Sequence, residues 1–124
     1  MDKALEGVKI LDLSRVQAGP SCTQLLGFLG ADVIKVEPPH GDLLRAVSPI
    51  HREHSTYVGQ LNLGKRSLSI DLKKPNALEV VTHLAAQSDV LVENFRPGVM
   101  ERFGLGYLSL SEQRPDLVYC SISG

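Results

Sequence analysis

Five short segments rich in valine, isoleucine and leucine recur along this chain and constrain its fold more than any other feature. They cover residues 8–13, 32–37, 67–72, 89–94 and 117–122, each about six residues long. Continuous apolar runs of this length are typical of strands buried on both faces. Because most of the intervening stretches have room for a helix, the pattern favours βαβ units with right-handed crossovers. We therefore predict an α/β fold with an open, mainly parallel sheet of about five strands and flanking helices.

Turn and cap residues predict the two main helices. Ala18-Gly19-Pro20 opens the first helix, because proline suits the first helical turn, and Gly30 ends it. The second helix is expected over residues 76–86, where Asn76 and Glu79 have the spacing of a capping box. The side chains expected to face the sheet from this helix are Leu78, Val81, Leu84 and Ala85.

The remaining connections are predicted to be irregular. Pro97 begins a short helix that closes near Gly104, and Ser109 with Glu112 forms another capping box before the last strand. Residues 38–62 contain three prolines and three histidines without sustained periodicity, so they are predicted to form a long loop. Loops of that length are usually functional or mobile, which suggests that a ligand or partner covers this one.

Length and composition limit the class of protein. The 124 residues predict a single domain, residues 1–124, and a hydrophobic fraction of 43% supports a buried core. The net charge of −1 gives no bulk attraction to nucleic acid or anionic membranes, so neither is expected as a partner. No apolar run approaches the roughly 20 residues of a membrane helix, and residues 2–7 do not resemble a signal peptide, so a cytoplasmic location is expected. Cys22 and Cys120 are predicted to be reduced, buried thiols.

Two motifs suggest chemistry that their context does not support. Gly59, Gly64 and Lys65 have the spacing of a phosphate-binding loop, but Arg66 replaces the magnesium-binding serine or threonine and a strand follows instead of a helix. The pairs Lys65-Arg66 and Lys73-Lys74 then remain as ends of one strand, either meeting phosphates or simply solvated. His51 and His54 lack further zinc ligands nearby, so no metal site is predicted.

Polar residues that follow the predicted strands suggest a ligand crevice. In open α/β sheets, ligands bind at the carboxyl ends of the strands. Three such segments are the loop 14–20, Lys73, and the turn Asn94-Phe95-Arg96. Amides offer hydrogen bonds, Phe95 offers a stacking face, and Arg96 and Arg102 offer phosphate-binding forks. The alternative is a turn with a polar rim and no ligand.

Four segments together resemble a known family. They are VKILDLSRVQAGPSCTQLLGFLGADVIKVEPPHGDLLR, GKRSLSIDLK, SDVLVENFRPGVMERFGLGY and DLVYCSISG, and from the first to the last they extend over nearly all of the chain. In order and spacing they resemble the N-terminal portion of the family III (CaiB/BaiF type) CoA-transferases, most closely the formyl-CoA:oxalate type. The resemblance implies a Rossmann-like fold and a CoA or acyl-CoA ligand. Members transfer CoA from an acyl thioester to a carboxylic acid through an aspartate nucleophile.

The resemblance also implies roles for particular residues. Gln17, with Val16 and Ala18, would border the thioester end of CoA, and Gln17 would assist catalysis by bonding the reacting acyl group. The stretch Ile70-Asp71-Leu72-Lys73 would line the adenosine part. The turn Asn94-Phe95-Arg96 would line the ligand, and Arg102 would lie near the phosphates.

Departures from the family pattern qualify the resemblance. Arg15 stands where the formyl-CoA members have histidine, and Pro38 where they have arginine. The family nucleophile lies beyond residue 124, so this chain alone is expected to be inactive.

Other functions and assemblies remain open from the sequence. The alternatives are a non-catalytic binding or interaction module and a fragment of a racemase-type acyl-CoA enzyme. Family members form interlocked dimers, but here we expect an ordinary homodimer or a complementing chain.

Overall fold

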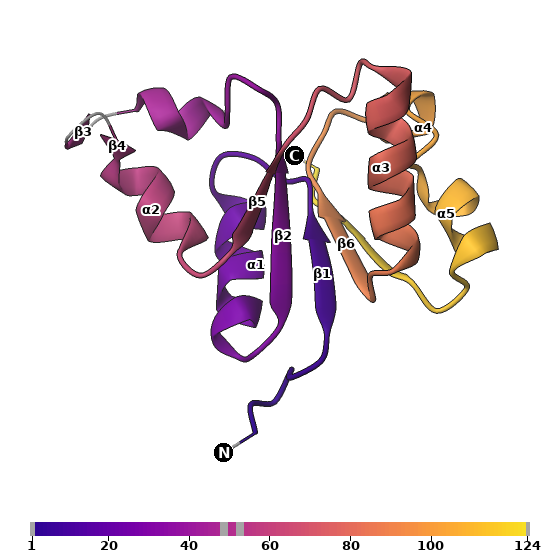
Figure 1. Cartoon of the computed structure of the whole chain (residues 1–124), viewed down its shortest axis with the longest axis horizontal. Helices are drawn as coiled ribbons and strands as arrows, with labels where there is room; N and C mark the ends of the chain where they lie inside the picture. The colour runs from indigo at the N-terminus through magenta and orange to yellow at the C-terminus, as the bar shows by residue number, and fades with distance from the viewer. Residues whose placement is uncertain (1, 48–49, 52–53, 124) are drawn as a thin grey trace.

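The computed structural model describes residues 2–47, 50–51 and 54–123. Its centre is a parallel sheet of five strands in the order β5-β2-β1-β6-β7 (Figure 1). The strands are β1 (Lys9–Asp12), β2 (Asp32–Glu37), β5 (Arg66–Ser69), β6 (Val90–Glu93) and β7 (Val118–Ser121). Each coincides with a predicted segment, although β5 ends three residues early. The Rossmann-like α/β fold is confirmed.

Helices cover both faces of the sheet. On one face α1 (Ala18–Phe28) packs through Leu26 against Ile10, Val33 and Val92, and α2 (Thr56–Asn62) lies beside α1. The helices on the other face are α3 (Pro75–Ala86), α4 (Val99–Arg102) and α5 (Tyr107–Gln113). The larger core lies on this second face, where Val81 and Ala85 of α3 pack with Leu11 and Leu91. Alternate residues of each central strand therefore enter different cores, which explains the continuous apolar runs.

The helix boundaries correct both predicted capping boxes. Helix α3 begins at Pro75, with Lys74 as N-cap and no side-chain cap bond, because proline starts the helix before Asn76 is reached. Helix α5 begins after Gly106, so Ser109 lies inside the helix and caps nothing. The predicted end of α1 is confirmed, since Gly30 has a φ of +113°.

The segment 38–62 was wrongly predicted as a loop throughout. It contains a 3₁₀ helix η1 (Leu43–Ala46), a short antiparallel pair β3 (Ile50–His51) and β4 (His54–Ser55), and helix α2. The oxygen of Asp42 accepts from Leu44 N at 3.0 Å and Ser55 Oγ accepts from Val58 N, so each helix has a side-chain cap. A third small core forms from Leu44, Val58 and Leu61. Residues 48–49 and 52–53 of the predicted loop lie outside the described residues.

Cysteine burial also differs from the prediction. Cys22 is exposed on α1, and Cys120 on β7 is half-buried, although both are free thiols as expected. Cys22 is exposed because α1 turns Gly19, Pro20 and Thr23 toward the interior instead. Within the described ranges, no helix is long and apolar enough to cross a membrane.

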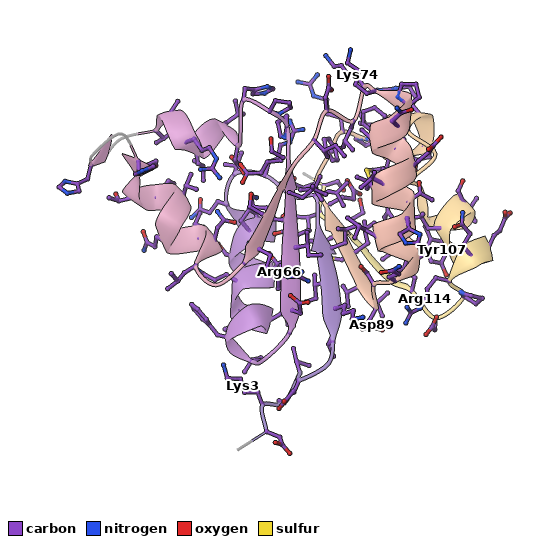
Figure 2. The ribbon with its side chains drawn as sticks, viewed as in Figure 1. Lys3, Arg66, Lys74, Asp89, Tyr107 and Arg114 are labelled. Carbon is purple, nitrogen blue, oxygen red and sulfur yellow. The ribbon has the colours of Figure 1, made fainter. Side chains whose placement is uncertain are left out.

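Lys65 and Arg66 both form ion pairs within the protein, which corrects the idea that this end of β5 meets phosphates. Lys65 Nζ lies 2.9 Å from Asp12 Oδ2, and the two side chains are 3% and 0% exposed. Lys65 also donates to the carbonyl of Pro20, so one ammonium joins β1, β5 and α1. Burial lowers the pKa of Lys65, against the raising effect of the Asp12 charge and hydrogen bond. Arg66 instead pairs with Asp32 at the surface (Figure 2).

Replacing these two neighbouring cations should have different effects on stability. Lys65→Met leaves the Asp12 carboxylate buried without its ion pair, so the free energy of unfolding should fall by about 3–5 kcal/mol. Arg66→Met is the matched control and should change the free energy of unfolding by at most about 1 kcal/mol. The side chains of its ion pair, Arg66 and Asp32, are 64% and 46% exposed. Urea denaturation followed by circular dichroism measures both. Equal losses in the two variants would contradict the structural role of the Asp12–Lys65 pair.

Candidate functional site

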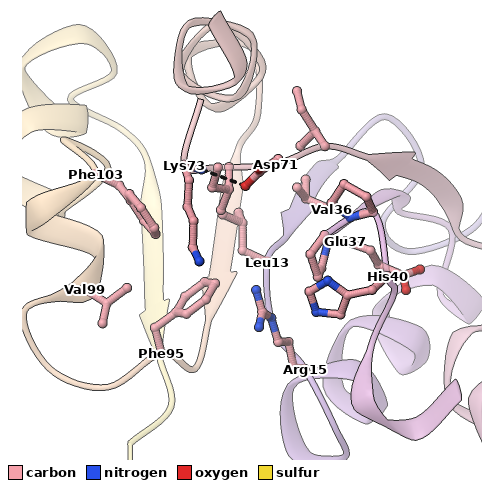
Figure 3. Close-up of a pocket in the computed structure, with 14 residues that line it drawn as sticks. Leu13, Arg15, Val36, Glu37, His40, Asp71, Lys73, Phe95, Val99 and Phe103 are labelled. Atoms are coloured by element: carbon pink, nitrogen blue, oxygen red, sulfur yellow. Dashed lines mark hydrogen bonds between the residues drawn. The ribbon is translucent and has the colours of Figure 1, made fainter. Parts of the chain in front are cut away.

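A cavity of about 510 Å³ opens at the carboxyl ends of four adjacent strands, β5, β2, β1 and β6 (Figure 3). The chain builds β2 and β5 on one side of β1 and then crosses to β6 on the other side. Ligands of open α/β sheets bind where the strand order reverses in this way. The residues lining the cavity divide into an apolar group, Leu13, Val36, Pro38, Pro39, Ile70, Leu72, Phe95, Val99 and Phe103, and a polar group, Arg15, Glu37, His40, Asp71 and Lys73.

Two loops that are far apart in sequence meet at this cavity. The backbone N–H of Arg15 donates to Asn94 Oδ1, and Asn94 Nδ2 donates back to the Arg15 carbonyl, both at 2.8 Å. The predicted meeting of the loops after β1 and β6 is therefore present in the structure. The oxygen and the nitrogen of the Asn94 side chain both form hydrogen bonds with the Arg15 backbone. Asn94 therefore positions the loop in this structure and does not present its amide to the cavity.

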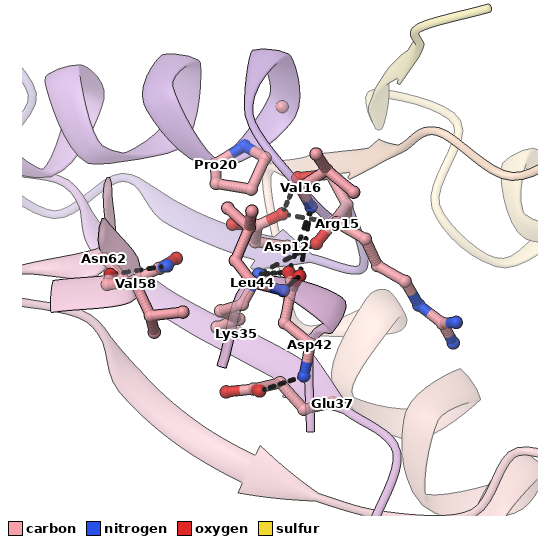
Figure 4. Close-up of polar contacts among 12 residues, drawn as sticks. Asp12, Arg15, Val16, Pro20, Lys35, Glu37, Asp42, Leu44, Val58 and Asn62 are labelled. Atoms are coloured by element: carbon pink, nitrogen blue, oxygen red, sulfur yellow. Dashed lines mark hydrogen bonds and ion pairs between the residues drawn. The ribbon is translucent and has the colours of Figure 1, made fainter. Parts of the chain in front are cut away.

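Val16 has a backbone conformation that is rare for its residue type. Its φ is +67°, in the left-handed region that a β-branched side chain disfavours. The Val16 N–H donates to the buried carboxylate of Asp42, 3.1 Å from Oδ2. Lys35 Nζ lies 3.4 Å from that same oxygen and also donates to the Ser14 carbonyl at 2.9 Å (Figure 4). These contacts hold the strained residue in place just before the start of α1.

Asp12 fixes the other side of the same loop. Its carboxylate accepts from the Ser14 backbone N–H at 2.9 Å, the Ser14 hydroxyl, and Thr23 Oγ1 at 2.6 Å. Gly19 packs so closely on Ser14 that a Cβ at this position would overlap the serine side chain. The loop between β1 and α1 is thus wound tightly by its own buried hydrogen bonds, and glycine is required for the close approach.

Glu37 closes one wall of the cavity as a charged group. Arg45 donates to its two oxygens, 2.8 Å from Nε and 2.6 Å from Nη2, and the Asp42 N–H donates at 2.9 Å. Burial raises the pKa of Glu37, but the Arg45 hydrogen bond and charge, the Asp42 N–H and Lys35 outweigh it, so the net pKa is lowered. Glu37 is therefore held ionised and already paired, and it is not a free base.

The predicted site residues fall into two groups in the structure. The predicted residues that line the cavity are Ile70, Asp71, Leu72, Lys73 and Phe95. The others lie outside its lining. Val16, Gln17 and Ala18 are exposed around the start of α1, and Asn94 holds the loop. Arg96 is exposed before α4, and Arg102 is exposed as the last residue of that helix. Arg96 instead borders a second cavity of about 320 Å³ with Glu93 and Tyr119.

Several cavity residues were missed as site residues. Glu37 is the last residue of β2, and His40 and the prolines follow it, so the rule used for the other strand ends could have found them. Phe103 packs edge-on against Phe95, with ring centroids 6.4 Å apart, and no local signal marks it because α4 brings it there. Across the described part of the chain, no three His, Cys, Asp or Glu side chains cluster as metal ligands do.

Comparison with known proteins identifies the family. Residues 5–124 match the model of CoA-transferase family III, nearly the whole of the sequence. The chain belongs to CoA-transferase family III.

Named relatives and solved structures agree with this assignment. A formyl-CoA:oxalate CoA-transferase from Bradyrhizobium sp. (strain ORS 278) is 49% identical over 126 residues, and one from Streptomyces coelicolor is 46% identical over 123 residues. These alignments cover 100% and 98% of this chain but 30% of each relative. The crystal structure of a CaiB/BaiF family protein from Brucella suis has a TM-score of 0.95 at 43% identity, covering 100% of this chain and 34% of that one. Rv3272 from Mycobacterium tuberculosis, in its orthorhombic form, has a TM-score of 0.91 at 40% identity, covering 98% of this chain and 35% of that one. The chain thus spans about a third of the length of its relatives.

The strain at Val16 can be tested by removing its side chain. Val16→Gly relieves about 1–2 kcal/mol of left-handed strain and costs about 0.5–1 kcal/mol of backbone entropy, so the free energy of unfolding should rise slightly. Val47→Gly is the matched control, because Val47 is equally exposed, 42% against 41%, but has a φ of −89°. This control should lower the free energy of unfolding by about 1 kcal/mol. Chemical denaturation measures the free energy of unfolding of both variants. An equal decrease in the two would show that Val16 is not strained.

Proposed function

We propose that this chain forms the CoA-binding portion of an enzyme that transfers CoA from an acyl thioester to a carboxylic acid. Membership of CoA-transferase family III supports a CoA thioester as the ligand. The likeness to proteins named formyl-CoA:oxalate CoA-transferase, at 46–49% identity across the chain, supports a small carboxylate as the acceptor.

The observation that carries the proposal is the composition of the 510 Å³ cavity. Its floor is apolar, and it contains the rings of Phe95 and Phe103, which suit a planar base. Arg15 and Lys73 enter it as cations, and neither forms an ion pair within the described residues. CoA combines an adenine ring with phosphate groups, so its nucleotide end matches both properties of the cavity.

The two groups of predicted residues then divide the ligand between them. The stretch Ile70–Lys73 and Phe95 hold the nucleotide end in the cavity. The thioester end extends past Arg15 to Val16, Gln17 and Ala18, where the exposed amide of Gln17 is free to bond the reacting acyl group. Asn94 acts through the Arg15 backbone, while Arg96 and Arg102 remain available at the outer edge for phosphate.

The nucleophile is proposed to come from outside these 124 residues. A carboxylate that attacks a thioester must be accessible to it. Asp12 and Asp42 are fully buried and hydrogen-bonded within the protein, so neither can reach a substrate. Relatives extend well beyond the matched part, since the chain covers 30% of their length. We therefore expect no transfer by the 124 residues alone.

Calorimetric titration of the purified chain with CoA tests this function. The wild-type chain should bind CoA saturably and show no turnover of formyl-CoA with oxalate. Lys73→Gln removes a charge-assisted hydrogen bond and should weaken CoA binding by about 5- to 30-fold. The control Lys74→Gln changes the adjacent exposed cation, outside the cavity, and should stay within about twofold.

Two outcomes would count against the proposal. A folded wild-type chain without saturable CoA binding would exclude the binding role. Turnover by the 124 residues would contradict the external nucleophile.

A second candidate function, a protein interaction module, is favoured by the outer face of α1. Leu25, Phe28 and Leu29 are 60%, 53% and 45% exposed there, an unusual apolar row on a surface helix. On this hypothesis the row pairs two copies of the chain. Sedimentation equilibrium should then show a dimer that Leu25→Glu weakens, and a strict monomer at high concentration would exclude the pairing.

A further inference from the structure

Arg15 has a polar atom without a partner at the cavity wall. Its Nε is buried and makes no hydrogen bond, which holds for no other buried side-chain nitrogen or oxygen within the described ranges. The guanidinium lies over the ring of Phe95, with Cζ 4.8 Å from the centroid. Leaving a buried charged donor unsatisfied is costly, so this site favours a ligand that accepts a hydrogen bond there.

The acidic groups around the cavity are already engaged elsewhere. Glu37 accepts from Arg45, and Asp42 from Val16 and Leu44, beside Lys35. Asp71 accepts from the Lys73 backbone N–H at 3.0 Å. Among the described residues no carboxylate forms an ion pair with Arg15. Because Arg45 pairs with Glu37, the two cations Arg15 and Lys73 face the single charge of Asp71, and this positive excess suits an anion.

Three basic side chains come from three different strand ends to this place. In Figure 3, Arg15, His40 and Lys73 point toward the same space, with Phe95 beneath it. They follow β1, β2 and β5, so the sheet order holds them in place. An anion at this position would be approached from three directions by hydrogen-bond donors.

The Arg15 side chain is held in this orientation before any ligand arrives. Its backbone N–H and carbonyl are both bonded to Asn94, and its guanidinium rests on Phe95. A fixed guanidinium loses little conformational entropy on binding, and its Nε and Nη groups form a fork that matches two phosphate oxygens. The fork edge that contains Nε is the edge left unpaired.

We propose that Arg15 is the residue by which this chain recognises a phosphate of the nucleotide end of CoA. The inference rests on the proposed function, which places that end in the cavity. The guanidinium bridges the Phe95 ring and the phosphate, with Lys73 as the second cation. The phosphate is either the 3′-phosphate or the 5′-diphosphate, which share the same acceptor chemistry.

Calorimetry with CoA, dephospho-CoA and adenosine tests the role of Arg15. Arg15→Gln should weaken CoA binding by about tenfold or more, since a charge-assisted bidentate contact is lost. Arg15→Lys keeps the charge but loses the fork, so its loss should be intermediate. Adenosine carries no phosphate, and its affinity should change by less than about twofold.

Both Asn94 bonds use the Arg15 backbone, so the substitutions leave the loop intact, which thermal melting checks. Lys74→Gln is the control.

The outcomes separate this inference from the proposed function. If Arg15→Gln weakens the binding of CoA but not of dephospho-CoA, the contact is to the 3′-phosphate. If it weakens the binding of both ligands equally, the contact is to the diphosphate. Either result supports the role of Arg15. If the wild-type chain binds CoA and Arg15→Gln binds it within twofold, the inference fails while the proposed function stands. The inference also fails if Arg15→Gln weakens the binding of adenosine as much as the binding of CoA, because Arg15 would then act by packing on the base. If the wild-type chain does not bind CoA, both fail.

Discussion

The buried charges at the carboxyl edge of the sheet determine how the rest of the structure is arranged there. The carboxylates of Asp12 and Asp42 lie in the interior, and Lys65 and Lys35 lie beside them with 3% of each side chain exposed. An isolated charge at such depth would be very unfavourable, so each ion is paired and further hydrogen-bonded. The hydrogen-bond partners of these charged side chains are largely backbone groups of residues 14–20. The hydrogen bonds that stabilise the buried charges therefore also shape the loop between β1 and α1. The strained conformation of Val16 follows from that demand.

The same arrangement explains why the cavity beside the loop is electrostatically suited to an anion. Two acidic groups of this edge are paired internally, Glu37 with Arg45 and Asp42 with Lys35, while the carboxylate of Asp71 accepts a backbone N–H. Within the part of the chain that the structure describes, Arg15 and Lys73 have no carboxylate partner, and they lie next to apolar walls. A weak net charge for the whole chain, −1, therefore hides a local excess of positive charge. The proposed binding of a nucleotide end depends on this local excess, which a count of charged residues does not reveal.

Prediction from the sequence succeeded where a local pattern has one physical solution. The five apolar segments became the five strands, and Gly30 ended α1 because its conformation suits few other residues. It failed where two local solutions compete. Asn76 was expected to cap α3, but Pro75 starts the helix a residue earlier. Residues 38–62 lack helical periodicity, yet Val58 and Leu61 form a helix because they bury a small core with Leu44. Part of the cavity lining was predictable from strand ends, whereas Phe103 reaches it only through the packing of α4.

The sequence by itself determined the α/β class, the parallel strands and the family, because apolar periodicity and ordered motifs are properties of the chain read in one dimension. Only the tertiary structure decided the strand order, and with it which strand ends meet at the cavity. It also decided which charges are free: Lys65 and Lys73 bracket the same strand, yet one is buried against Asp12 and the other faces the cavity. The physical reason is that the energy of a charge depends on its burial and its partners, and those come from residues distant in sequence.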